Sequence, residues 1–188
     1  MNLADYIGDH PVIAALRDKK EIGLALASKA SAVFLLGGSL FDLSDNVKTL
    51  QRAGKIVFVH LDLIGGLNKD HSAVHIVANH IQPNGILTTK NALIPTIQKL
   101  GMLAGQRCFL LDTQSYYMTV KSARSSKPDF VELMPGIIPD VIAQFCEDTS
   151  CPAIAGGFVS SVKNVERALA AGAIGASSSR TTLWNYTR

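Results

Sequence analysis

Two groups of small residues near the carboxyl end of the chain have the composition of a phosphate-binding site. Ala155-Gly156-Gly157 ends one apolar run, and Ser177-Ser178-Ser179-Arg180 ends the next. Glycine lets backbone amides approach an anion closely, and the amides that open a following short helix, here residues 181–186, favour negative charge. We predict that the phosphate-binding residues are Gly156, Gly157, Ser177 and Ser178. Taken singly, a Gly-Gly pair is also typical of a turn, and a serine run of a helix cap.

Ionisable side chains stand at the ends of other apolar runs and predict a polar ring around the same site. The ring comprises Arg17, Asp62, Lys90, Asp112 and Glu132. Carboxylates accept and Lys or Arg donates, so together they suit the hydroxyls of a small polyol. Glu132 stands inside the apolar run Phe130–Leu133, where a carboxylate is costly to bury unless it has a partner.

Simpler roles stay open for several of these residues. Asp62 and Asp112 could cap the segments that follow them, and His60, two residues before Asp62 and so on the same face, could be a core histidine or a base. Lys90 could form a Schiff base, but that requires a dry pocket and a depressed pKa, and no pattern in the sequence indicates either.

Eight short apolar runs position these residues, and amphipathic stretches separate them. The runs begin at Pro11, Ala32, Lys55, Asn84, Gly105, Asp129, Pro152 and Ala173. The spacing, 21 to 29 residues, is close to the minimum for a strand, a helix and two loops. We predict an α/β fold, a compact (β/α)8 TIM barrel with minimal loops that forms one domain over residues 1–188; an open doubly wound sheet is the alternative. Counting back in twos from the strand ends predicts that Leu110, Cys108 and Phe130 face the barrel interior.

Composition excludes several other classes. The chain has 188 residues, 47% of them hydrophobic and 18% charged, which is typical of a globular protein and excludes a disordered tail or a coiled coil. Its three cysteines lack the spacing of a zinc site, so we predict no metal and reduced thiols. The first residues do not resemble a secretion signal and no apolar run approaches 18 residues, so we predict a soluble, cytoplasmic protein without a membrane partner.

A net charge of +3 identifies no partner by itself. Lys121, Arg124 and Lys127 recur at every third residue of one predicted helix, which makes a modest basic face that could contact RNA. Such a run is more often simply a solvated face. A homo-oligomer would double it.

Beyond the fold, the chain resembles the glycerol uptake operon antiterminator family. The resemblance extends over nearly the whole chain, in the ordered blocks PVIAALRD, GKIVFVHLDLIGGLNKD, TTK, QRCFLLD, KPDFVELMPGIIP, PAIAGGFV and ALAAGAIGASSS. It departs from the family pattern at Gly65-Gly66, where a charged residue and Gly are usual, and at Ser178, where Thr is common.

The resemblance implies a non-catalytic regulator of a glycerol-utilisation operon. Its effector would be glycerol 3-phosphate, with no cofactor, and its partner would be leader mRNA, in which it prevents termination. Phosphate would bind at Gly156, Gly157, Ser177 and Ser178, and the ring of ionisable residues defined above would surround the glycerol. Two other hypotheses remain: an isomerase or aldolase acting on a small phosphorylated metabolite, and a ligand-sensing barrel with a protein partner.

Overall fold

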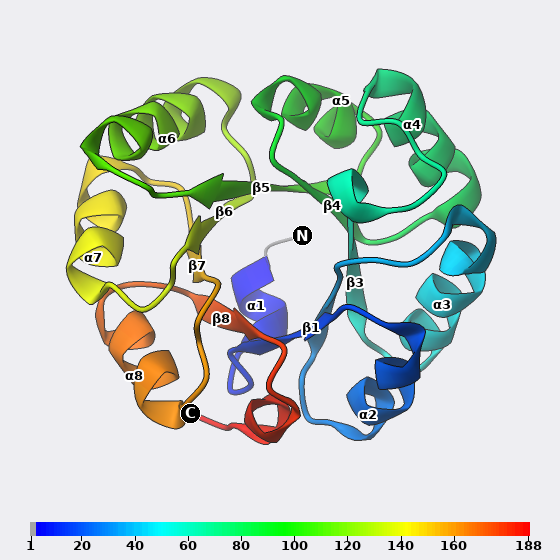
Figure 1. The fold of residues 1–188 in the computed structure, drawn as a ribbon, viewed down its shortest axis with the longest axis horizontal. Coiled ribbons are helices and arrows are strands. Elements are labelled where there is room, and N and C mark those ends of the chain that lie inside the picture. Colours follow the sequence, from blue (N-terminus) through cyan, green and yellow to red (C-terminus); the bar gives the residue numbers. More distant parts are fainter. Residues whose placement is uncertain (1–2) are drawn as a thin grey trace.

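The computed structural model describes residues 3–188, and within them eight parallel strands close into a barrel in chain order (Figure 1). The predicted (β/α)8 barrel is confirmed, and the open sheet is excluded because β1 pairs with both β2 and β8. The strands are β1 Val12–Leu16, β2 Ala32–Leu35, β3 Ile56–His60, β4 Gly85–Thr88, β5 Leu103–Phe109, β6 Phe130–Met134, β7 Ala153–Ala155 and β8 Gly175–Ser178.

Helices form the outer layer. The helices that follow strands one to seven are α2 Ile22–Ala27, α3 Leu40–Arg52, α4 His71–Ile76 continued by the π-helix η3 Val77–Ile81, α5 Ile94–Lys99, α6 Thr113–Ser126, α7 Pro139–Asp148 and α8 Val162–Ala170. Short 3-10 turns are η1 Lys19–Glu21, η2 Leu61–Leu63 and η4 Asn91–Leu93. After β8, the described chain forms the 3-10 helix η5 Thr181–Asn185, where the other strands are followed by an α-helix.

Local sequence explains where these helices begin and end. The Ser161 hydroxyl accepts from Asn164 N and caps α8, and the Asp70 carboxylate caps α4 by accepting from Ala73 N. Gly54, Gly101 and Gly172 have positive φ values and end outer helices, as left-handed residues commonly do.

The strands separate two apolar layers. Outward-facing strand residues pack against the helices, whereas inward-facing ones fill the barrel with the three mutually contacting rings of Phe34, Phe58 and Phe130. The helix α1, Leu3–Ile7, packs Leu3 and Ile7 into this interior layer (Figure 1). The side chains of α1 therefore cover one end of the barrel interior.

The alternation along β5 corrects one prediction. Phe130 faces the interior as expected, but Cys108 lies in the outer layer near Thr119 of α6, and Leu110 packs against the same layer. Counting back from Asp112 was wrong because β5 ends at Phe109, so Asp112 does not continue its alternation. Arg107 points inward in place of Cys108.

In the described residues, no helix is long and apolar enough to cross a membrane.

Candidate binding site

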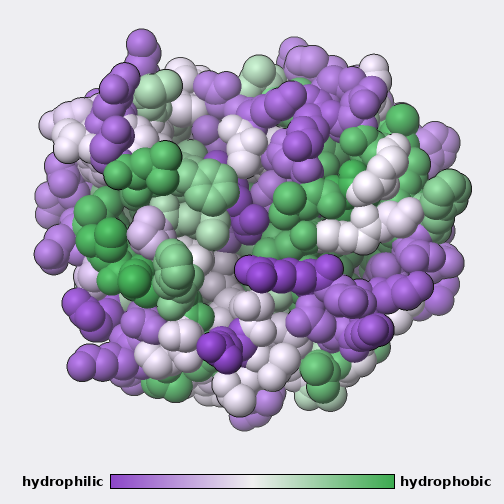
Figure 2. Space-filling model, viewed as in Figure 1, coloured by the Kyte–Doolittle hydropathy of each residue, from purple (hydrophilic) through white to green (hydrophobic). Residues whose placement is uncertain are grey.

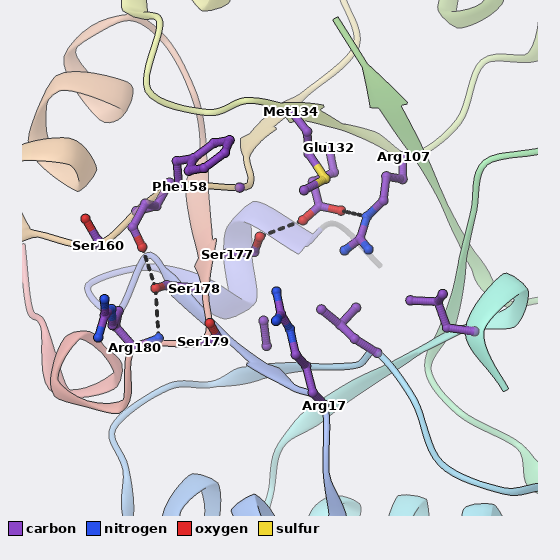
Figure 3. Close-up of a pocket in the computed structure, with 15 residues that line it drawn as sticks. Arg17, Arg107, Glu132, Met134, Phe158, Ser160, Ser177, Ser178, Ser179 and Arg180 are labelled. Carbon is purple, nitrogen blue, oxygen red and sulfur yellow. Dashed lines mark hydrogen bonds and ion pairs between the residues drawn. The ribbon is translucent and has the colours of Figure 1, made fainter.

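A cavity of about 560 Å³ opens at the carboxyl ends of the strands (Figure 3). It is lined by Ala15, Arg17, Leu36, Leu63, Arg107, Glu132, Met134, Gly157, Phe158, Val159, Ser160, Ser177, Ser178, Ser179 and Arg180. Figure 2, drawn from the same side, shows hydrophilic surface at the centre of this face with hydrophobic patches to either side. The cavity therefore combines polar groups with an apolar rim, as small-molecule sites do.

A buried ion pair forms one wall. Arg107 Nε lies 2.5 Å from Glu132 Oε2, across the paired strands β5 and β6, and Ser177 Oγ donates to Glu132 Oε1 at 2.6 Å. Glu132 is fully buried, so the two donors compensate the cost of placing its carboxylate there. The predicted network role of Glu132 has a structural basis in these contacts.

The serine run supplies both structure and lining. Ser178 Oγ donates to the Val159 carbonyl at 2.7 Å and accepts from Arg180 N, while the Ser178 carbonyl accepts from Trp184 Nε1. These bonds tie the loop after β7 to the chain after β8. In this arrangement the Ser177 and Ser178 hydroxyls donate within the protein, and Ser179 and Arg180 extend the lining outward.

The two glycines predicted to bind phosphate, Gly156 and Gly157, lie in different positions relative to the cavity. Gly157 lines the cavity with φ of +73°, a conformation that favours glycine. Gly156 lies behind it: a Cβ there would be 2.5 Å from Glu132 Oε1. Gly156 thus makes room for the buried carboxylate instead of lining the cavity.

The structure brings only part of the predicted ring together. Arg17 and Glu132 line the cavity, and Arg17 extends toward its middle in Figure 3, whereas Asp62, Lys90 and Asp112 are not among its lining residues. Asp112 is exposed and caps α6 by accepting from Ser115 N at 2.7 Å, a bond that lowers the pKa of its carboxyl. Lys90 Nζ donates to the Lys69 carbonyl at 2.6 Å.

His60 ends β3, and Asp62 follows it in the 3-10 turn η2. His60 Nδ1 is 3.7 Å from Asp62 Oδ2, which accepts from Thr89 N. Burial, followed by the positive charge of Arg107, lowers the pKa of His60 to about 4, although Asp62 acts in the opposite direction. His60 is consequently neutral at pH 7.

The three basic residues considered for RNA follow the length of α6. Lys121 borders a shallow hollow with Tyr117 and Met118 near the start of the helix. Arg124 Nε donates to the Asp148 carbonyl at 2.9 Å, and Lys127 ends the helix in a left-handed conformation. None of the three lines the cavity at the mouth.

Sequence reasoning missed Arg107, the partner of Glu132. The signal was present, because Arg107, like Glu132, is a charged residue within a buried strand, and the two are paired in register on adjacent strands. It also missed Phe158, a residue that borders the mouth, is 78% exposed and has a positive φ of 58°.

Three arginines against one glutamate leave an excess of two positive charges among the lining residues. No lysine is found among them, and no cluster of three potential metal ligands occurs in the described part of the chain. Such a cavity suits an anion, and guanidinium groups in particular suit a phosphate.

Comparison with known proteins agrees with this chemistry. Residues 12–184 match the model of the family described as glycerol-3-phosphate responsive antiterminator. The chain belongs to this family. The family resemblance predicted from the sequence is therefore confirmed, and with it a role in transcription antitermination.

Solved structures extend the likeness to the whole barrel. The glycerol uptake operon antiterminator regulatory protein of Listeria monocytogenes is 32% identical, with a TM-score of 0.90 over 94% of this chain and 96% of that one. A glycerol uptake operon antiterminator-related protein from Thermotoga maritima is 30% identical, with a TM-score of 0.79 over 92% of this chain and 96% of that one.

Among relatives found by sequence, the uncharacterized protein YgcP of Escherichia coli is 29% identical over all of this chain and 98% of its own length.

Aldolases share the fold alone. The deoxyribose phosphate aldolase of Aeropyrum pernix has a TM-score of 0.73 over 94% of this chain and 88% of its own, but is only 11% identical.

Proposed function

We propose that this antiterminator binds glycerol 3-phosphate in the cavity at the barrel mouth and then acts on leader mRNA to prevent termination in a glycerol-utilisation operon. The observation that carries the proposal is the set of three arginines that line the cavity together with Gly157 and the serine run. Arg17, Arg180 and Ser179 would donate to the phosphate, beside Gly157, Ser177 and Ser178. Arg107, held by Glu132, would face the glycerol part.

Regulation then requires a coupling between effector and RNA. Glycerol 3-phosphate must bind the RNA-competent state more tightly than the other state, and RNA must raise the affinity for the effector by the same factor. With a net charge of +3, we expect few phosphate contacts in the RNA complex and a shallow dependence of affinity on salt.

The test has two parts. Glycerol 3-phosphate at a hundredfold excess over its Kd should stabilise the free protein by about 2.7 kcal/mol, measured as a rise in Tm. A mobility-shift assay on leader RNA should then show tighter binding with the effector than without it. No change in Tm at millimolar effector contradicts the binding proposal, and an unchanged RNA shift contradicts the coupling.

Ser178→Asp places a carboxylate against the proposed phosphate position and should abolish effector binding in calorimetry. Ser178→Ala is the matched control, because it removes the hydroxyl without adding charge and should retain measurable binding. An unchanged affinity in Ser178→Asp would remove the chain after β8 from the phosphate site.

For the RNA, the predicted face is Lys121, Arg124 and Lys127 on α6. A triple alanine variant should weaken the RNA shift and leave effector binding intact, since the face lies outside the cavity. Unchanged RNA binding would place the RNA elsewhere.

The aldolase alternative receives less support from the cavity. A Schiff base needs a lysine in the pocket, and none of the lining residues is a lysine, while the Lys90 amine donates to a backbone carbonyl. If the protein turned over any member of a panel of phosphosugars, that result would favour the hypothesis that it is an isomerase or aldolase.

A further inference from the structure

The outer helix α6 differs from the other long helices in its charge. Among the described helices of nine residues or more, it alone has basic residues and no acidic ones. Lys121 and Arg124 are exposed along it, and the exposed Lys127 follows at its carboxyl end. Cations gathered along one helix without neighbouring carboxylates in that helix favour a polyanionic partner.

Two hollows lie along α6, and their linings differ in chemistry. The apolar hollow, of about 490 Å³, has an aromatic ring and a thioether in its lining, from Tyr117 and Met118. The basic hollow, of about 390 Å³, has two cations and two hydroxyls in its lining, from Arg124, Lys127, Thr149 and Ser150. Tyr117 and Arg124 are about 10 Å, or two helical turns, apart along the helix. The two hollows therefore offer separate places for an apolar group and for an anionic group of one ligand.

The ring of Tyr117 is held in position although the residue is 62% exposed. It meets the ring of the buried Tyr116 edge to face, with centroids 5.7 Å apart and planes at 70°. The Tyr116 hydroxyl donates to Asp148 Oδ2 at 2.6 Å, which ties that ring to α7. The contact restricts the exposed ring, so a ligand that stacks on it loses less free energy to ordering.

An unpaired nucleotide has both of the groups that these hollows suit. Its base presents a flat face that stacks on an aromatic ring, whereas the faces of paired bases are already covered in a duplex. An acidic peptide would pair with the cations, but its carboxylates would gain nothing from the apolar hollow. Asp112, whose pKa is lowered by its bonds to Ser115, places a negative charge at the start of α6. Phosphates are therefore favoured toward the other end of the helix, where the cations lie.

We propose that α6 binds an unpaired segment of the leader RNA, with a base stacked on Tyr117 in the apolar hollow and the adjoining phosphates at Lys121 and in the basic hollow. The inference rests on the proposed function, because it takes leader mRNA to be the partner. It adds Tyr117 and Met118 to the basic face of α6, and it assigns single-stranded RNA as the form that is bound.

The test compares RNA affinities at saturating glycerol 3-phosphate. Fluorescence anisotropy of labelled leader RNA gives the Kd for the wild type, Tyr117→Ala and Tyr117→Phe. Tyr117→Ala should raise the Kd by about fivefold or more, whereas Tyr117→Phe keeps the ring and should stay within about twofold of the wild type. Tyr117→Leu keeps an apolar contact with Tyr116 but lacks the flat ring. It should bind as weakly as Tyr117→Ala, and it keeps the test valid if the alanine variant loses stability.

Salt dependence separates stacking from charge. Lys121→Ala should reduce the slope of log Kd against log salt concentration by about one, because one phosphate contact is lost. Tyr117→Ala should leave that slope unchanged, since stacking of a base releases no counterion. Leader RNA annealed to a complementary oligonucleotide has no unpaired bases. It should bind the wild type more weakly, and no better than it binds Tyr117→Ala.

The matched control is Tyr6→Ala, which removes another exposed tyrosine, from α1, and should keep the wild-type affinity for RNA. If the wild type does not bind leader RNA, the proposed function and this inference both fail. If the wild type binds but Tyr117→Ala binds equally well, or the paired RNA does, the inference alone is overturned. It is also overturned if Tyr117→Phe binds as weakly as Tyr117→Ala, because the ring is then not what the RNA contacts.

Discussion

At the scale of single residues, the fully buried Glu132 is the centre of the site. Its carboxylate accepts from Arg107 and from Ser177, so it holds a cation at the cavity and orients a serine at once. The position of this carboxylate also explains a neighbouring glycine, since any side chain at Gly156 would collide with it.

Glu132→Gln should destabilise the protein strongly. The substitution keeps the side-chain shape but leaves Arg107 buried without a counter-charge, which costs about 3–5 kcal/mol in comparable buried pairs. Urea unfolding measures the loss. Ser177→Ala removes only a hydrogen bond to the same carboxylate and should cost about 1–3 kcal/mol. Equal small losses in both variants would contradict a dominant ion pair.

His60 should make stability depend on pH. Its folded pKa, about 4, lies below the ordinary value of 6.5, so the unfolded chain binds the proton more readily. The contribution is present in full above about pH 6.5 and is lost as the pH falls toward 4, to a total of about 3 kcal/mol. His60→Phe should flatten this part of the profile of unfolding free energy against pH. Parallel profiles for variant and wild type would show that His60 does not titrate in this range.

At the residue scale, the need for a buried partner could be predicted from the sequence of a single strand. A carboxylate within Phe130–Leu133 needed a partner whatever the fold, so Glu132 could be predicted. The positions of the Lys90 and Asp112 side chains depend on the conformations of the loops after their strands. The spacing of apolar residues does not specify those conformations. Asp112 takes the capping role that the sequence left open, because it accepts from Ser115 N at the start of α6.

At the scale of elements, β5 shows how closely the barrel interior is filled. A Cβ at Gly105 would lie 2.3 Å from Phe130 Cζ and 2.9 Å from Leu87 Cδ1. The glycine thus admits the stacked and edge-on phenylalanine rings that occupy the barrel below the cavity.

Gly105→Ala should therefore destabilise the barrel by about 1–3 kcal/mol or more, through overpacking. Gly101→Ala is the matched control, because nothing lies within 4 Å of its added Cβ and only the positive φ of 78° opposes it, at about 1 kcal/mol. Thermal unfolding of the two variants compares these costs. A larger loss at Gly101 would mean that the rings move aside easily.

The periodicity of the sequence predicted the strands well, because residues buried on both faces form continuous apolar runs. It failed at β5, where Leu110 and Leu111 prolong the run beyond the strand, which ends at Phe109. The short helix predicted after β8, over residues 181–186, is confirmed as the 3-10 helix Thr181–Asn185, in which Trp184 Nε1 donates to the Ser178 carbonyl.

At the scale of the whole molecule, a packed apolar layer and an open cavity occupy opposite ends of the barrel. The helix α1 fills one end with Leu3 and Ile7, and the cavity occupies the other (Figures 1 and 3). Barrels of this class commonly divide stability and ligand binding between their two ends.

Ile7→Ala should cost about 2–5 kcal/mol of unfolding free energy, because the side chain is buried and its Cδ1 approaches the start of β8 at Gly175. The affinity for glycerol 3-phosphate, measured below the Tm of the variant, should not change. A weaker affinity would show that α1 at one end of the barrel is coupled to the cavity at the other end. Tyr6→Ala on the same helix is the control, since Tyr6 is 45% exposed and should cost less.

The arginines of the cavity also determine how binding responds to acidity. Guanidinium groups in general keep their positive charge throughout the physiological range. A phosphate monoester, by contrast, passes from dianion to monoanion near pH 6. Between about pH 5 and 8, the electrostatic attraction of these arginines for the effector should therefore follow the ionisation of the effector. A protein that binds its ligand in this way senses the concentration of one ionic form of that ligand.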